Sequence, residues 1–269
     1  MIVFAGIVPH PPLAVPGVGK DDVKKVGETV KALEKLSEKL AEAEPDTIIV
    51  ISPHMVHYPH LFNICGMGDL FGGFSAFGFA EFEWHGRNNV GLATEIADKS
   101  EEEGIPAILY NNGEEEYEID HSVMVPLYYI MQKIEHSFKV LPIGYSVASR
   151  GEHYSFGQII AAVCERHKDQ RIAIIASGDL SHRLLENPGS QNTGKAFDKE
   201  IVELVKKGDE FSIVNIDEDI LDHSGECGYR SILILLGVLS GRDYAPEVYS
   251  YEGPFGVGYM VANMGVRSS

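Results

Sequence analysis

Acidic, hydroxyl and imidazole side chains follow a strongly apolar stretch in the middle of the chain. The stretch 172–182 reads IAIIASGDLSH. Its apolar start is typical of a strand buried on both faces of a parallel sheet. Asp179, Ser181 and His182 then come within four residues, at the carboxyl end of the strand, where open α/β sheets bind their ligands. These residue types predict a metal-binding or catalytic role at this edge of the sheet.

Two earlier apolar stretches end in a similar way, with a proline and then a histidine. His10 lies between two prolines after the stretch 2–8, and prolines hold the neighbouring backbone in an extended, rigid conformation. His54 and His57 follow the stretch 46–52. Because the carboxyl ends of parallel strands meet at one edge of a sheet, three strands are expected to deliver histidines to one place.

Two neutral imidazoles with one carboxylate make the ligand set that suits non-haem Fe(II) and oxygen chemistry. The acidic residues considered for the third position are Glu226, Asp179, Asp120 and Asp222. Glu226 has glycines nearby at Gly225 and Gly228, which let the backbone come close to a site. Its neighbour Cys227 offers a soft thiolate, which suits Zn(II) or Cu(I) better than an open Fe(II) centre. The third ligand and the metal therefore stay open at this point.

Simpler interpretations apply to parts of this pattern. Isolated histidines are more often hydrogen-bonded core or surface residues, and we expect this of His85, His136, His153 and His167. The segment SGDLSH can also cap a helix through Asp179 or Ser181. Serine hydrolysis by Ser181 and His182 is disfavoured because adjacent residues on a strand or turn usually point apart. The sequence has no nucleophile elbow, phosphate-binding loop or HExxH motif.

The periodicity of apolar residues predicts an α/β fold that can position these side chains. Strands are expected at 2–8, 46–52, 60–66, 105–110, 138–145 and 172–175. Helices are expected at 20–44, 90–103, 151–167, 196–208 and 232–239, with another beginning at 120–122. The segment 242–265 predicts an antiparallel edge hairpin. The Gly- and Phe-rich segment 66–89 shows no clean period, and we expect a long excursion that walls a pocket with aromatic rings.

Composition narrows the class of protein. The length of 269 residues and a hydrophobic content of 44% favour a single domain over 1–269. A net charge of −18 makes nucleic acid an improbable partner. Three widely spaced cysteines predict neither a disulfide framework nor a metal knuckle, and they favour a reducing, cytoplasmic setting. The first residues predict a strand and not a signal peptide, and no apolar run is long enough to cross a membrane.

Five motifs together resemble the class III extradiol ring-cleavage dioxygenases, the LigB-type superfamily of the protocatechuate 4,5-dioxygenase catalytic subunit. They are VPHPP (8–12), SPH (52–54), DHSVMVPL (120–127), SGDLSH (177–182) and GECGYRS (225–231), in the family's order and over nearly the whole chain. The resemblance implies Fe(II) bound by His10, His54 and Glu226. It also implies His182 as an acid/base residue near the metal and His121 in the pocket for substrate and oxygen.

The same resemblance implies a single α/β domain around a mixed, mostly parallel sheet flanked by helices, often as a homodimer. The implied reactants are a catechol-like substrate and O2. Cys227-Gly228 also resembles a motif of the related Memo branch, where a cysteine replaces the carboxylate. The alternative is therefore a Memo-like redox or signalling protein that binds metal, Zn or Cu included, through His10, His54 and Cys227 without ring cleavage. A purely structural or protein-interaction module is a third hypothesis.

Overall fold

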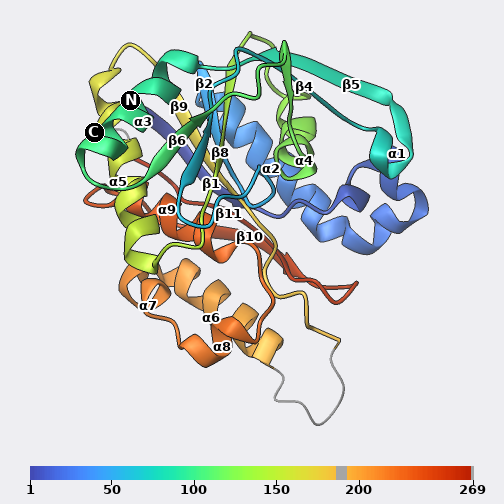
Figure 1. Ribbon diagram of the computed structural model, residues 1–269. Coiled ribbons are helices and arrows are strands. Elements are labelled where there is room, and N and C mark those ends of the chain that lie inside the picture. The colour runs from blue at the N-terminus through green and yellow to red at the C-terminus, as the bar shows by residue number, and fades with distance from the viewer. Residues whose placement is uncertain (186–192, 268–269) are drawn as a thin grey trace.

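The computed structural model describes residues 1–185 and 193–267. They form an α/β domain with helices on both faces of one mixed sheet (Figure 1). This confirms the predicted fold class. Residues 186–192 and 268–269 lie outside the described structure, so the domain limits of 1–269 stay a prediction.

Four parallel strands occupy the centre of the sheet. Strand β9 (Ile172–Ser177) lies between β1 (Ile2–Val8) and β2 (Thr47–Ser52), and β8 (Lys139–Gly144) pairs with the far side of β2. Every residue of β2 and β9 is buried, as expected of strands covered by helices on both faces. All four run in one direction, so the segments after β1, β2 and β9 leave the sheet at the same edge.

The rest of the sheet mixes parallel and antiparallel pairs. The main path runs β10-β11-β1-β9-β2-β8-β5-β4-β7, and β3 pairs with β8 and β6. The C-terminal hairpin forms one edge of the sheet and is antiparallel. The outer strands are β3 (Phe62–Cys65), β4 (Asp69–Phe74), β5 (Phe79–Arg87), β6 (Ala107–Tyr110), β7 (Glu116–Glu118), β10 (Glu247–Glu252) and β11 (Tyr259–Asn263).

The segment 66–89 differs from its expected irregular conformation. It forms β4 and β5, which pair as an antiparallel hairpin. Buried and half-buried residues alternate along β4, but two of its six positions are Gly72 and Gly73. Because glycine has no side chain, it hides the alternation from a hydropathy pattern. A short 3₁₀ turn, η3 (Ser75–Phe77), joins the two strands.

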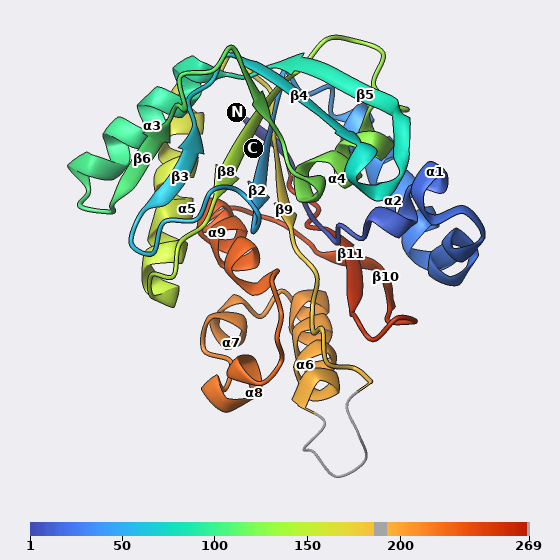
Figure 2. The same ribbon diagram turned by 45° about the vertical axis from the view of Figure 1, so that its right-hand side comes forward.

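Helices cover the two faces of the sheet as separate layers. Helices α3 (Val90–Glu102), α5 (Arg150–Arg166) and α9 (Tyr229–Leu239) contribute to one apolar core, and α2 (Gly27–Glu42) and α4 (His121–Ile130) to the other. Figure 2 shows α6, α7 and α8 gathered near one another below α9. The remaining helical segments are α1 (Pro16–Gly19), α6 (Thr193–Lys207), α7 (Glu210–Val214), α8 (Glu218–Asp222), η1 (Pro12–Ala14) and η2 (Lys20–Val26).

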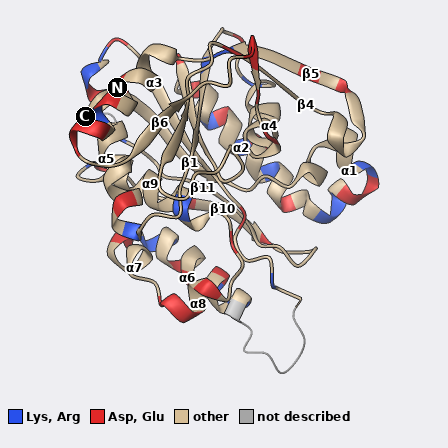
Figure 3. Ribbon diagram, in the orientation of Figure 1, with Lys and Arg blue, Asp and Glu red and all other residues tan. Residues whose placement is uncertain are grey.

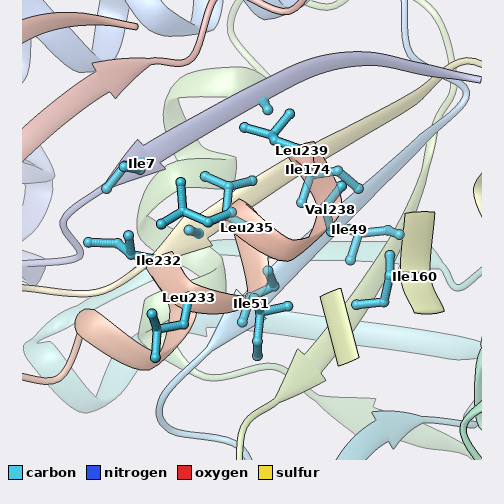
Figure 4. Packing of buried hydrophobic residues seen from close by; sticks show 14 of the residues in the cluster. Ile7, Ile49, Ile51, Ile160, Ile174, Ile232, Leu233, Leu235, Val238 and Leu239 are labelled. Carbon is cyan, nitrogen blue, oxygen red and sulfur yellow. The ribbon is translucent and has the colours of Figure 1, made fainter. Parts of the chain in front are cut away.

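Close packing against α5 fixes the position of α9. A Cβ atom on Gly157 would lie 2.0 Å from the carbonyl oxygen of Ile234, and one on Gly237 would lie 2.0 Å from that of Tyr154. Figure 4 shows aliphatic side chains of α9 beside those of the central strands. Since protein cores are packed as densely as organic crystals, this contact fixes how α9 lies against α5, and the segment 225–228 directly precedes α9 in the chain.

Charged residues lie mostly on the helices and loops that surround the sheet (Figure 3). The buried side chains of the central strands are mostly aliphatic. Among the helices of the described residues, none combines the length and the apolar character that crossing a bilayer requires.

Candidate metal centre

Three histidines from different parts of the chain meet at the edge of the sheet where the central strands end. His10 follows β1, His54 follows β2, and His121 is the first residue of α4. Their ring centroids are 4.7 to 5.3 Å apart, and the Nε2 atoms of His10 and His54 are 3.2 Å apart. One ligand atom from each ring lies within 4.8 Å of the others. This spacing lets a single cation contact all three imidazoles.

The backbone around His10 is held by the neighbouring strand. The His10 N–H donates to Oδ1 of Asp179 at 2.9 Å, and its Nδ1 lies 3.1 Å from the Ser177 hydroxyl. The His10 side chain is buried. Since β1 and β9 are paired in register up to Val8 and Ser177, the pairing itself brings the first histidine motif to the SGDLSH motif.

A network of hydroxyl groups joins the end of β2 to the start of α4. Asp120 caps α4 by accepting the Ser122 N–H at 2.7 Å, and it also accepts the Ser52 hydroxyl at 2.9 Å. The Ser52 oxygen in turn accepts the His54 N–H at 3.1 Å. Asp120 is therefore committed to positioning His54 and His121, and it belongs to neither group of metal-competent side chains found among the described residues.

A second group of donors adjoins the three imidazoles and shares His10 with them. It contains Asp179 and Cys227. The Cys227 sulfur is 3.7 Å from Nε2 of His10, and Oδ2 of Asp179 is 3.9 Å from the same nitrogen. The Asp179 N–H donates to the Cys227 sulfur at 3.3 Å. A thiol and a carboxyl group thus lie beside the histidines, each within reach of a cation bound at His10.

Two glycines let the SGDLSH and GECGYRS motifs touch. A Cβ atom on Gly178 would lie 2.1 Å from the Cα of Gly228. The N–H groups of Cys227 and Gly228 both donate to the Asp179 carbonyl, at 3.2 and 2.9 Å. Any side chain at position 178 would push the two backbones apart, so this contact holds Cys227 against His10.

Glu226 and Asp222 are not brought to the histidines. The Glu226 carboxylate accepts the Tyr229 N–H at 2.5 Å and lies 3.8 Å from the Arg230 guanidinium, so it caps the first turn of α9. Asp222 is the last residue of α8 and lines a cavity of about 470 Å³ between α5, α8 and α9. Neither belongs to the metal-competent groups of the described residues. The inward-facing member of the Glu226-Cys227 pair is the cysteine.

His182 lies at the rim of the cluster. Its side chain is 43% exposed, and its Nε2 is 3.8 Å from Oδ2 of Asp179 and 3.9 Å from the Cys227 sulfur.

Two simpler interpretations of the sequence can also be compared with the structure. No helix begins in residues 178–185, so SGDLSH is not a helix cap there. Four histidines were expected to be hydrogen-bonded core or surface residues, and each contacts a group outside the cluster. They are His85, His136, His153 and His167.

Burial favours the uncharged forms of several side chains in the cluster. Burial, together with the neighbouring imidazoles of His54 and His121, holds the pKa of His10 well below its usual value. Burial also lowers the pKa of His121, raises that of Asp179 to about 6, and raises that of the Cys227 thiol. Neutral imidazoles have free lone pairs, and a cation favours the ionised forms of carboxyl and thiol groups. The donor set therefore fits a divalent or soft monovalent metal ion.

An apolar rim adjoins the histidines on the solvent side. The Phe77 ring, at the η3 turn, is 41% exposed and lies 5.4 Å from the His121 ring, nearly edge-on. Val56, between His54 and His57, is also exposed. The aromatic wall expected from the segment 66–89 is thus represented here by Phe77, although a hairpin carries it.

The loop that carries Asp179 and His182 is held by a buried acid that sequence reasoning missed. Asp198, on α6, accepts the Ser181 N–H at 2.8 Å and the Tyr251 hydroxyl at 2.7 Å. Its sequence signal is an acidic residue beside Phe197 on the apolar side of an amphipathic helix. Burial raises its pKa to about 6.

Replacing Asp198 by asparagine is expected to change how stability depends on pH. A carboxyl group whose pKa is raised on folding stabilises the folded state below its unfolded pKa. That contribution is lost as the pH rises from about 4 to about 6, at a total cost of about 3 kcal/mol. Asp198→Asn should remove most of this loss in urea unfolding compared between acidic and neutral pH. The exposed Asp21→Asn is the control, and an unchanged pH dependence in Asp198→Asn would contradict the assignment.

Comparison with known proteins gives the chain relatives over most of its length. Residues 5–262 match the family described as the catalytic LigB subunit of aromatic ring-opening dioxygenase. Protein CA_C1420 of Clostridium acetobutylicum is 35% identical over 265 residues, covering 96% of this chain and 56% of that protein. This chain therefore spans little more than half of that relative. The 3,4-dihydroxyphenylacetate 2,3-dioxygenase of Escherichia coli is 24% identical over 233 residues, covering 80% of this chain and 82% of that enzyme.

A solved structure shows the same fold. The crystal structure of the uncharacterized protein JW3007 from Escherichia coli K12 superposes with a TM-score of 0.65, covering 97% of this chain and 99% of that one. The sequence identity is 14%. At that identity the likeness supports the architecture alone.

Proposed function

Because the chain belongs to the family of the catalytic LigB subunit of aromatic ring-opening dioxygenases, we propose that it is an Fe(II)-dependent extradiol dioxygenase. Its substrates in this proposal are O2 and a catechol-like aromatic compound. The observation that carries the proposal is the cluster at the sheet edge, where Nε2 of His10 lies 3.2 Å from Nε2 of His54 and 3.9 Å from Oδ2 of Asp179. Two imidazoles and a carboxylate, with other positions open, suit Fe(II) and O2.

In this proposal His10 and His54 hold the metal, and a carboxylate completes the set. The family resemblance points to Glu226, but that side chain would have to leave the N-terminus of α9 to reach the cluster. Asp179, another candidate from the sequence, lies 3.9 Å from Nε2 of His10 and forms a metal-competent group with His10 and Cys227. We therefore favour Asp179 as the carboxylate of a ring-opening enzyme.

The other residues have separate roles in the proposed reaction. Bound Fe(II) would supply Lewis-acid and redox chemistry and hold both reactants in one coordination sphere. His182 reaches solvent and the cluster, and we assign it the transfer of a phenolic proton at Nε2. His121 is neutral at physiological pH and contacts the substrate or oxygen by hydrogen bonding. Phe77 packs against the aromatic ring and excludes water from that side.

Iron reconstitution tests this function directly. After anaerobic loading with Fe(II), mixing with catechols and O2 is expected to produce yellow ring-opened products, followed by absorbance. The matched control is His54→Ala, which removes one proposed ligand and should abolish both iron retention and colour. A fully iron-loaded protein that gives no absorbance change with any catechol would count heavily against ring cleavage.

A second candidate is a metal-binding redox or signalling protein without ring cleavage. The contact of 3.7 Å between the Cys227 sulfur and Nε2 of His10 favours it, because a thiolate donor suits Cu(I) or Zn(II). His10, His54 and Cys227 would hold the metal. Retention of Cu(I) or Zn(II), with no catechol turnover in the iron-loaded protein, is the result expected from this candidate.

The proposed setting is a reducing, cytoplasmic compartment, and the proposed assembly is a homodimer. Reducing conditions keep Cys227 as a thiol, which is its state in the structure. Light scattering of the purified chain tests the assembly, and a mass of one chain at micromolar concentration would exclude a stable dimer.

A further inference from the structure

Ser177, the last residue of β9, lies between the His10 ring and the start of α4. Its side chain is buried. The hydroxyl oxygen is 3.1 Å from Nδ1 of His10 and 2.7 Å from the backbone carbonyl oxygen of Ser122. This hydroxyl therefore links a proposed metal ligand to the first turn of a helix.

The two contacts of Ser177 are not interchangeable. A carbonyl oxygen only accepts hydrogen bonds, so the single hydroxyl proton of Ser177 is committed to Ser122. The hydroxyl oxygen can then only accept from the His10 ring. This requires the proton of the neutral His10 imidazole to sit on Nδ1, which leaves the lone pair of Nε2 free. Nε2 is the atom that faces His54, at 3.2 Å, and Cys227, at 3.7 Å.

A proline makes the Ser122 carbonyl available. In an α-helix the carbonyl of Ser122 would accept the N–H of the residue four positions later. That residue is Pro126, which lies inside α4 and has no N–H to donate. The missing helical bond leaves an acceptor at the end of β9, where the Ser177 hydroxyl donates to it.

We propose that Pro126, the Ser122 carbonyl and Ser177 form a relay that fixes the tautomer of His10, with Ser177 as a positioning residue. The relay presents Nε2 of His10 as a ready metal ligand before any metal binds. It rests on the metal-binding role proposed for His10, but not on the substrate or the reaction. Hydrogen-bond partners of the second ring nitrogen commonly orient metal-bound histidines in this way.

The relay also determines the state of His54 in the metal-free protein. Two bare nitrogens at 3.2 Å would repel each other, so Nε2 of His54 carries a proton and donates to Nε2 of His10. A metal ion that binds both nitrogens must displace this proton. His10 and His54 are therefore expected to be opposite tautomers without metal, and only His54 changes its Nε2 proton when metal binds.

Nitrogen NMR of the metal-free full chain tests the tautomers. With ¹⁵N-labelled histidine, each ring nitrogen reports whether it carries a proton, and His10→Asn and His54→Asn assign the signals. The expected result is a protonated Nδ1 and a bare Nε2 for His10, with the reverse for His54. A protonated Nε2 on His10 would overturn the proposal, whatever the protein does with catechols.

Substitution of Ser177 tests whether the relay matters for metal binding. Ser177→Ala removes the acceptor and is expected to mix the His10 tautomers and to weaken Zn(II) binding by about 10- to 100-fold. Ser177→Thr keeps the hydroxyl and should restore both properties. Equal Zn(II) affinity and an unchanged tautomer in Ser177→Ala would overturn the proposal. If the alanine variant does not fold, the wild-type tautomers and the threonine variant still decide it.

A double-mutant cycle tests the part assigned to Pro126. Pro126→Ala supplies an N–H that competes for the Ser122 carbonyl, so Zn(II) affinity should fall in that variant. Since both changes act through one relay, adding Pro126→Ala to Ser177→Ala should cause little further loss. Additive losses would show that Pro126 acts independently and would overturn its place in the relay.

Discussion

Replacing Cys227 by serine is expected to weaken Zn(II) binding by more than about 100-fold if the thiol is a ligand, because losing a ligand costs more than losing the partner of a ligand. The Cys227 sulfur lies 3.7 Å from Nε2 of His10. Glu226→Gln should leave the affinity unchanged, since its carboxylate accepts the Tyr229 N–H on the other side of the turn. Glu226→Gln is therefore the matched control for Cys227→Ser, because only the cysteine variant is expected to lose Zn(II) affinity.

Titration with Zn(II) measures these affinities, and Co(II) provides a second readout. A cobalt-thiolate bond has a charge-transfer absorption that a serine ligand lacks, so the band identifies the donor without any assay of activity. Asp179→Asn completes the set because it removes the carboxyl group beside His10. Loss of Fe(II) binding in this variant, with Cys227→Ser unaffected, would support the ring-opening centre over the thiolate centre.

Glu226→Gln also carries an expectation for stability. The glutamine oxygen can still accept the Tyr229 N–H, whereas the contact with Arg230 loses its charge. Because the Glu226 side chain is only 5% exposed, the cost should be about 1 to 3 kcal/mol of unfolding free energy. A large loss of metal with little loss of stability would instead return Glu226 to the position that the family resemblance assigns to it.

The sequence predicted the meeting of distant histidines for a physical reason that needs no coordinates. Apolar runs before His10 and His54 predicted parallel strands, and parallel strands in one sheet end at one edge. The structure has both strands in the centre of the sheet, separated by β9. Local sequence therefore suffices to place these two side chains.

The orientation of Glu226 and Cys227 could not be predicted in the same way. Adjacent side chains face opposite directions in a turn, and which one faces inward depends on the path of the backbone. That path is set by Gly225 at a positive φ of 65° and by the contact between Gly178 and Gly228. Both are tertiary features, because a glycine in a sequence does not reveal which backbone it touches.

Ser177 and Asp198 were missed as supporting residues for a related reason. The role of Ser177 depends on the Ser122 carbonyl, which is more than fifty positions away in the sequence. The role of Asp198 on α6 depends on the Ser181 N–H, which belongs to the loop after β9. The sequence predicted a helix that begins at residues 120–122, and Pro126 lies inside this helix, α4. A proline four residues after a serine does not by itself indicate a functional contact. The contact becomes apparent only from the structure, where the end of β9 lies beside the Ser122 carbonyl.

Replacing His182 by alanine is expected to slow catechol turnover by about 10²- to 10⁴-fold without loss of Fe(II). This range is the usual contribution of a positioned acid or base. His182 lies outside the group formed by His10, His54 and His121, and its side chain is 43% exposed, so proton exchange with solvent is available to it. A proton-transfer role should appear mainly in kcat, with one limb of the pH-rate profile lost.

The exposed His85→Ala is the matched control, because it removes an imidazole of similar exposure from β5 and should change neither kcat nor iron content. Iron content and kcat of His182→Ala together separate three roles. Loss of iron would make His182 a ligand, and unchanged kcat would exclude proton transfer. Retained iron with a low kcat that exogenous imidazole partly restores would assign the proton to this side chain, since a diffusing base can replace the missing function only where solvent reaches the site.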